Sequence, residues 1–227
     1  MLVEPEQDPH RLAADQAVVE AIRARAALGP HASVDAAAIG LRQLLPTLSS
    51  YDRQAVRALL GRIEAATAPP LVSCGPLSQM LASDRWGLSH SPVAEPDQAL
   101  KHAASGGRAL IDLSSPRPWW AKLLALPQVR VTGALPDDAA SLPRCLLIST
   151  EGSGPTGDDR TFWVTDSGWP DARIAEALGQ QGLYASPISA SGGLKLFILT
   201  GYVQAQDPRL ASAPGQISGV IGAAPVY

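Results

Sequence analysis

Two short stretches of this chain carry groups that could bind a charged small molecule. Asp158, Asp159 and Arg160 are consecutive and come directly before a run of alternating side chains. Carboxylates beside a guanidinium can hold an amine or an anion, although a salt-bridged loop without a ligand has the same composition. Gly75-Pro76 precedes a helical pattern, and the N–H groups of a helix N-terminus can hold an anion. A single Gly-Pro pair is not specific to such sites.

A tryptophan pair, Trp119-Trp120, offers a different kind of contact. The two indole rings could stack on an aromatic ligand. Alternatively, such a pair opens a helix by burying one ring and leaving the other where two domains meet.

Metal and cofactor chemistry is not predicted. The four histidines have no paired spacing typical of zinc sites: His10, His31, His90 and His102. Cys74 and Cys145 each lie in an apolar run, which favours two free, buried thiols in a reducing cytoplasm.

Composition bounds the classes of partner. The chain has 227 residues, 46% hydrophobic and 17% charged, with a net charge of −3, as in a globular protein. Arginines are scattered and lysines are few, so no basic surface for nucleic acid is predicted. No apolar run approaches the ~20 residues of a membrane span, and the acidic start lacks a signal-peptide core. We therefore expect a cytoplasmic protein.

The C-terminal part must position the Asp159–Arg160 group. Alternation over residues 161–165 predicts a half-buried strand. Pro170 suits a first helical turn, and Gly182 suits the position just past the helix end. A second strand is predicted over residues 194–199, after Gly192-Gly193.

The rest of the chain divides into helices and a mixed region. Residues 8–66 read as three helices, the first ended by Gly29-Pro30 and the third begun by a capping box at Ser49 and Asp52. Strands are predicted at 71–74, 109–113, 130–132 and 145–148, with helices between them, which indicates a small parallel or mixed sheet. We expect an α+β protein with domains at 1–67, 71–150 and 160–227.

Several motifs resemble a bacterial group that joins a chorismate-mutase-type helical segment to a remnant of prephenate dehydratase. Residues 197–202 resemble the strand that ends the ACT core of dehydratases, and residues 221–225 resemble their closing segment. Asp159, Arg160 and Thr161 occupy the place of the dehydratase Thr-Arg-Phe signature, and Trp119-Trp120 recurs in this group. The resemblance implies a type II chorismate mutase-like segment, a small α/β lobe and an ACT-like βαβ domain.

In the resembling ACT domains, an amino-acid effector lies in the first strand–helix turn. Asp166, Ser167 and Gly168 hold that position here, although these residue types are also common in ordinary turns. In dehydratases the catalytic threonine precedes the arginine, whereas Asp159 does so here, and residues 71–150 supply only one of two lobes. Prephenate dehydratase activity is therefore not expected.

The mutase resemblance can be tested against the chemistry. Rearrangement of chorismate needs cations for two carboxylates and for charge that develops on the ether oxygen. Asp15 and Arg25 fit the family pattern. The cations that are otherwise missing could be replaced by Arg11, Arg42 or Arg57. Arg25 could equally be a surface arginine beside Glu20. The predicted catalytic set is Arg25, Arg11 and Arg42, in a site that is degenerate or completed by the second chain of a homodimer.

Three functional hypotheses follow. The first is a chorismate mutase-related protein of phenylalanine and tyrosine biosynthesis, which converts chorismate to prephenate if it is active. The second is a non-catalytic regulatory or scaffold module that binds an aromatic amino acid or a partner enzyme through its ACT-like end. The third is a pairing protein without a ligand.

Overall fold

The computed structural model describes residues 8–29 and 34–227. Pro30, predicted to end the first helix, and His31 lie outside the described residues. The chain divides into two units, one up to residue 31 and one from residue 32 onward. The helices are α1 Pro9–Ala27, α2 Val34–Leu44, η1 Leu45–Thr47, α3 Ser50–Ala65, α4 Pro76–Trp86, α5 Pro96–Ala104, η2 Trp119–Ala125, α6 Asp171–Gly179 and η3 Pro208–Leu210. The strands are β1 Leu71–Cys74, β2 His90–Val93, β3 Arg108–Asp112, β4 Arg130–Leu135, β5 Cys145–Ser149, β6 Asp159–Thr165, β7 Ala185–Ser191, β8 Leu194–Thr200 and β9 Ser218–Pro225.

Helix α1 is the helix that the structure describes in the first unit. The Asp8 carboxylate accepts a hydrogen bond from the backbone N–H of His10 at 2.9 Å and begins the helix. Pro9 takes the first position, where its missing N–H leaves no bond unmade. Gly29 follows the helix with φ 74°, as a terminating glycine does. No residue of α1 is buried.

In the second unit, nine strands form one mixed sheet in the order β2-β1-β3-β5-β4-β9-β6-β8-β7. Strands β2, β1 and β3 are parallel, whereas β3, β5 and β4 are antiparallel neighbours. Strand β9 pairs with β4 and with β6, so the sheet continues from one predicted domain into the next. Helices α2 and α3 belong to the same unit as the sheet. The domain limits 1–67, 71–150 and 160–227 stay predictions.

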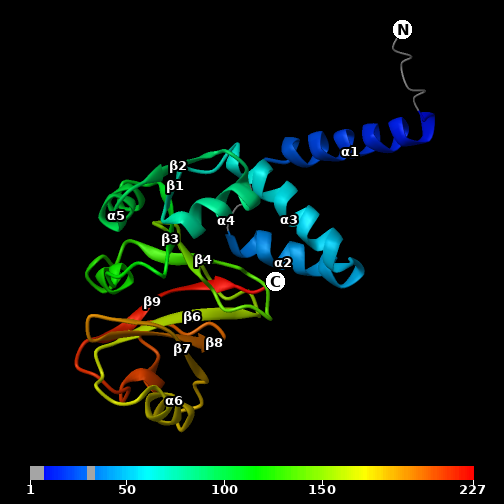
Figure 1. Ribbon diagram of the computed structural model, residues 1–227. Coiled ribbons are helices and arrows are strands. Elements are labelled where there is room, and N and C mark those ends of the chain that lie inside the picture. The colour runs from blue at the N-terminus through cyan, green and yellow to red at the C-terminus, as the bar shows by residue number, and fades with distance from the viewer. Residues whose placement is uncertain (1–7, 30–33) are drawn as a thin grey trace. The chain divides into compact units, whose positions relative to one another are not determined.

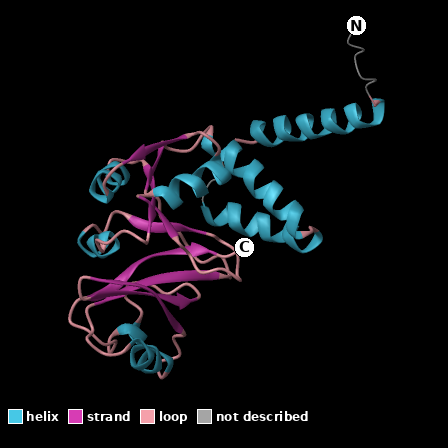
Figure 2. Cartoon of the chain, in the orientation of Figure 1, coloured by secondary structure: helices cyan, strands magenta, loops and turns pink. Residues whose placement is uncertain are grey.

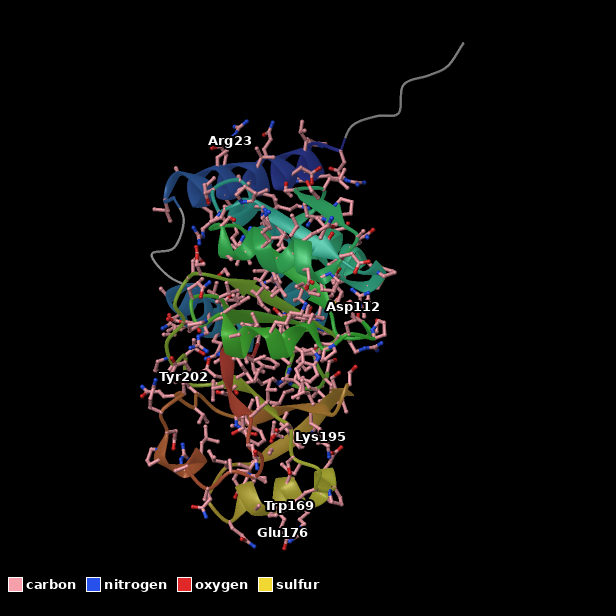
Figure 3. All side chains as sticks on the ribbon, turned by 90° about the vertical axis from the view of Figure 1, so that its left-hand side faces the viewer. Arg23, Asp112, Trp169, Glu176, Lys195 and Tyr202 are labelled. Atoms are coloured by element: carbon pink, nitrogen blue, oxygen red, sulfur yellow. The ribbon has the colours of Figure 1, made fainter. Side chains whose placement is uncertain are left out.

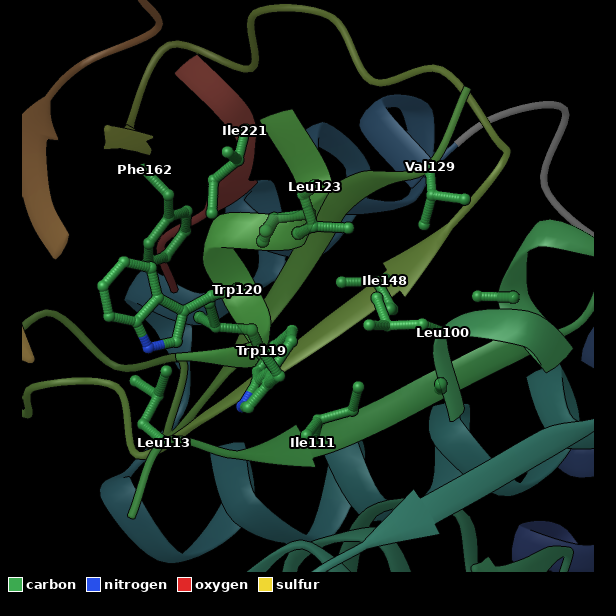
Figure 4. Close-up of a cluster of buried hydrophobic side chains, with 14 of the residues drawn as sticks. Leu100, Ile111, Leu113, Trp119, Trp120, Leu123, Val129, Ile148, Phe162 and Ile221 are labelled. Atoms are coloured by element: carbon green, nitrogen blue, oxygen red, sulfur yellow. The ribbon is translucent and has the colours of Figure 1, made fainter. Parts of the chain in front are cut away.

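Helices cover both faces of this sheet (Figures 1 and 2). On one face, α5 and η2 pack against a core that extends from β1 to β8 (Figure 4). On the other face, α4 covers β1 and β3, and α3 packs against α4. Helix α6 covers β6, β8 and β9 through Ile174 and Leu178. The architecture is a mixed α/β protein with N-terminal helices.

Most of the predicted elements are present, with small shifts. The capping box joins Ser49 and Asp52 as predicted. Pro170 precedes α6 as its N-cap instead of lying in the first turn, and Gly182 has the predicted positive φ, 75°. Trp119–Ala125 forms a 3₁₀-helix. Strands β2, β7 and β9 were not predicted because prolines and small residues dominate their sequences, HSPV, ASPISAS and SGVIGAAP.

Candidate functional site

The three parallel strands lie in the order β2-β1-β3, so the chain moves from β1 to one neighbouring position and then back past β1 to the other. Helix α4 leads from β1 to β2 on one side of β1, and α5 then returns to β3 on the other side. Right-handed crossovers in opposite directions place the two helices on opposite faces, and the two core clusters show them there. In open α/β sheets, ligands bind at the carboxyl ends of the strands at such a switch point.

A cleft of about 360 Å³ lies at this point. It is lined by the residues that follow the three strands: Cys74, Gly75, Pro76, Ala94, Glu95, Pro96, Ile111, Asp112, Ser114, Ser115, Pro116 and Arg117. Gly75 has φ 100°, and a Cβ there would lie 2.7 Å from the Cβ of Asp112. Glycine therefore allows β1 to turn into α4 directly beside Asp112.

Asp112 is the most enclosed charged group of the cleft, with 5% of its surface exposed. Its Oδ1 accepts a hydrogen bond from the N–H of Ser114 at 2.8 Å. The indole N–H of Trp119 donates to the Asp112 carbonyl at 2.9 Å, which fixes the end of β3. Oδ2 makes no hydrogen bond to a described residue, so one carboxylate oxygen at the cleft remains available to a ligand.

Charges of both signs stand around Asp112. Arg117 contacts Glu95 at 3.4 Å, and both side chains are largely exposed, so water weakens this ion pair and a ligand can compete for it. The N-terminus of α4 has no side-chain cap, which leaves backbone N–H donors near the cleft. Burial, followed by the charges of Glu95 and Asp112, raises the pKa of the Cys74 thiol. Cys74 therefore stays a neutral thiol at neutral pH.

The predicted catalytic arginines lie in both units. Arg11 and Arg25 are on α1, where the Arg25 guanidinium donates to the Gly29 carbonyl at 3.5 Å. Arg42 is on α2, in the second unit. Its guanidinium donates to the carbonyls of Thr156, Asp158 and Val226 and to the Thr156 hydroxyl. Arg42 thereby ties α2 to the loop before β6 and to the segment after β9.

The predicted ligand group at β6 makes bonds within the protein. The Asp159 carboxylate, 4% exposed, accepts from the N–H and the hydroxyl of Thr156 at 2.8 and 2.6 Å. Arg160 donates to the carbonyls of Asp138 and Ala139, each at 3.1 Å. The Thr161 hydroxyl donates to the Gly201 carbonyl at 2.7 Å. In the described part of the chain, Arg160 therefore bonds to backbone carbonyls and makes no ion pair with Asp158 or Asp159, unlike the salt-bridged loop of the sequence alternative.

The turn at Asp166-Ser167-Gly168 is also held internally. Asp166 Oδ1 accepts from the N–H groups of Gln216 and Ile217 at 2.8 and 3.0 Å. The Ser167 hydroxyl accepts from the Trp169 N–H at 3.3 Å. No other atom lies within 4 Å of a Cβ built on Gly168. Figure 3 shows Trp169 and Glu176 at helix α6, well away from Asp112.

Trp119 and Trp120 are both core residues. Each is 1% exposed, and Figure 4 shows the rings among the side chains of Phe162, Leu123 and Ile111. The structure therefore buries both rings, whereas the sequence alternative buried only one. A ligand could stack on either ring only by displacing core side chains.

Of the candidates named from the sequence, Gly75 and Pro76 line the cleft, whereas the predicted arginines, the Asp159 group, the Asp166 turn and the tryptophan pair do not. The role of the latter as ligand contacts stays a prediction. Sequence reasoning missed Glu95, Asp112 and Arg117 because β2 was not recognised. Without β2, the order β2-β1-β3 and its switch point could not be inferred. The available signal was that Gly75 directly follows one predicted buried strand and that Asp112 lies near the end of another.

Within residues 8–29 and 34–227, no group of three His, Cys, Asp or Glu side chains is arranged to hold a metal ion. No helix in the described part of the chain is long and apolar enough to cross a membrane.

No family model matches the chain, and no curated protein matches it. Four solved chains match in structure. GqqA, described as a novel type of quorum quenching acylase, has 14% identity and TM-score 0.47, covering 69% of this chain and 95% of its own. Prephenate dehydratase from Staphylococcus aureus has 12% identity and TM-score 0.45, covering 68% and 99%. Prephenate dehydratase from Arthrobacter aurescens, in complex with L-Phe, has 14% identity and TM-score 0.38, covering 68% and 89%. These identities and TM-scores are too low to establish a shared family or a shared activity.

Proposed function

We propose that this protein is a small-molecule binding protein with a regulatory role, and that the switch-point cleft takes an α-amino acid. One observation carries the proposal: a single cleft holds the unbonded oxygen of Asp112, the carboxylate of Glu95 and the guanidinium of Arg117. An α-amino acid presents an ammonium and a carboxylate a few ångströms apart, so its site needs acidic and basic groups together.

The dimensions of the cleft agree with this class of ligand. Its volume of about 360 Å³ lies in the range of small-molecule sites. Asp112 and Glu95 would hold the ammonium, and Arg117 with the N-terminus of α4 would hold the carboxylate. Pro76, Pro96 and Ile111 supply apolar wall for a side chain. Phenylalanine and tyrosine are the first ligands to test, because the sequence resembles proteins of aromatic amino-acid metabolism.

The finer sequence predictions belong to this proposal as well. Residues 160–227, with β6, α6, β7, β8 and β9, are proposed to be an ACT-like domain. Chorismate mutase activity through Arg25, Arg11 and Arg42 stays a prediction, as does the homodimer. The bonds that Arg42 makes to backbone carbonyls favour the binding protein over the mutase.

Isothermal titration calorimetry with L-phenylalanine and L-tyrosine tests the proposal. Asp112→Asn keeps an oxygen for the Ser114 N–H and removes the charge, so we expect affinity to fall roughly 10- to 100-fold. Arg209→Gln is the control, because Arg209 lies in η3 and does not line the cleft. Absence of heat with both amino acids at millimolar concentration, or unchanged affinity in Asp112→Asn, would refute the assignment.

A further inference from the structure

A second cavity, of about 90 Å³, lies among α3, α4, β4 and the end of β9. It shares no lining residue with the switch-point cleft. Five charged residues line it: Glu64, Arg85, Arg108, Asp137 and Glu151. Thr132, Trp86 and Tyr227 complete the polar and aromatic part of its wall.

Two of the three carboxylates are already paired with protein groups. One oxygen of Glu64 accepts from the Arg108 guanidinium, and the other accepts from the indole N–H of Trp86 at 3.2 Å. Arg57 and Arg85 share the carboxylate of Asp137, with the Arg57 nitrogen in contact and the Arg85 nitrogen at 3.7 Å. These two carboxylates therefore present little uncompensated negative charge to the cavity.

Arg85 stands in a different position. Its guanidinium carries five N–H donors, yet it makes no hydrogen bond to any described residue; its contact with Asp137 is longer than a hydrogen bond. The side chain is only 16% exposed. The guanidinium donors are not fully buried, so their acceptors come from outside the protein, as water or as a bound anion. Close approach of the helices fixes Arg85, since a Cβ on Gly61 of α3 would lie 2.2 Å from its carbonyl oxygen.

Guanidinium groups also gather around the neighbouring ring of Tyr227. The guanidinium carbons of Arg42 and Arg57 lie 5.9 and 5.3 Å from the ring centroid. Burial, and next the charge of Arg85, lowers the pKa of Arg57 to about 10. Arg57 stays protonated at neutral pH, because a pKa of about 10 lies well above 7.

We propose that this cavity is a binding site for a small oxyanion, with Arg85 as its principal ligand. The volume of about 90 Å³ is enough for a phosphate or a carboxylate group. Arg108 and the hydroxyls of Thr132 and Tyr227 are further donors on the wall. Glu151 is the opposing charge; it is exposed on its loop, where water screens it.

Titration of the full chain with sodium phosphate, against sodium chloride at equal ionic strength and pH 7, tests the site. We expect phosphate to raise the melting temperature in a saturable manner and chloride not to. A parallel titration with sodium acetate distinguishes a carboxylate site from a phosphate site. Equal effects of phosphate, acetate and chloride would overturn the proposal.

Variants then assign the site to Arg85. Arg85→Gln should weaken phosphate binding roughly 10- to 100-fold, as expected for loss of hydrogen bonds from a charged donor. Arg53→Gln, on the exposed face of α3, is the matched control and should bind as the wild type does. Glu151→Gln should bind phosphate more tightly, since it removes the opposing charge. Unchanged phosphate affinity in Arg85→Gln would overturn the proposal.

If Arg85→Gln does not fold, Thr132→Val serves in its place. It removes one wall hydroxyl while keeping the shape of the side chain, and binding should weaken several-fold, as expected for one lost neutral hydrogen bond. Unchanged binding in a folded Thr132→Val would then count as refutation. Amino-acid binding at Asp112 is measured separately, so either site can fail without the other.

Discussion

Replacement of Arg42 by alanine separates a structural role from a catalytic one. The guanidinium makes four hydrogen bonds, of which three go to the carbonyls of Thr156, Asp158 and Val226. A bond from a charged donor contributes about 1.5–3 kcal/mol. Arg42 is half-buried, so water can reach some of the acceptors in the variant. We therefore take the net loss as one to two such bonds, about 3 kcal/mol.

Urea denaturation and a thermal melt measure this loss. For a chain of this size, about 3 kcal/mol corresponds to a drop in melting temperature of roughly 6–12 °C. Arg42→Lys should lie between the wild type and Arg42→Ala, because lysine keeps the charge but lacks the planar arrangement of donors. Arg23→Ala is the control: Arg23 pairs with Glu20 on exposed α1 at 3.0 Å, and such pairs contribute about 0–1 kcal/mol. A loss below about 1 kcal/mol in Arg42→Ala would refute the reasoning.

Three further outcomes are expected. Gly75→Ala should lower the unfolding free energy by about 2 kcal/mol in denaturation and weaken amino-acid binding, because φ is 100° and the new Cβ meets Asp112. The control Gly168→Ala should change the unfolding free energy by less than about 0.5 kcal/mol. Burial, with Asp112, raises the pKa of Cys145 from 9.0 to about 12. The contribution of Cys145 to the unfolding free energy should therefore fall as pH rises from about 9 to about 12, by up to ~1.4 kcal/mol per pH unit, and in urea titrations the slope of Cys145→Ala should be less negative than that of the wild type. Purified protein should not convert chorismate to prephenate in a spectrophotometric assay; conversion that is lost in Arg25→Ala would instead support the predicted mutase site.

The sequence by itself determined the elements with strong local signals. The capping box at Ser49 and Asp52, the strand before Asp166 and the helix ended near Gly182 follow from hydrogen bonding and backbone preference within a few residues. The sequence also shows directly that Asp159 and Arg160 are neighbours of opposite charge. It could not indicate their partners, which are Thr156 and the carbonyls of residues 138 and 139.

Only the tertiary structure decided the order of the strands in the sheet and which charged groups meet. Strand β9 enters between β4 and β6, a pairing of distant residues such as Phe162 with Gly222 that no local pattern encodes. The cleft exists because β3 returns beside β1 and brings Asp112 next to Gly75. Arg85 likewise acquires its enclosed position from the packing of α3 on α4. Charge along a sequence identifies candidate groups, but their function depends on which charges share a cavity, and chain topology decides that.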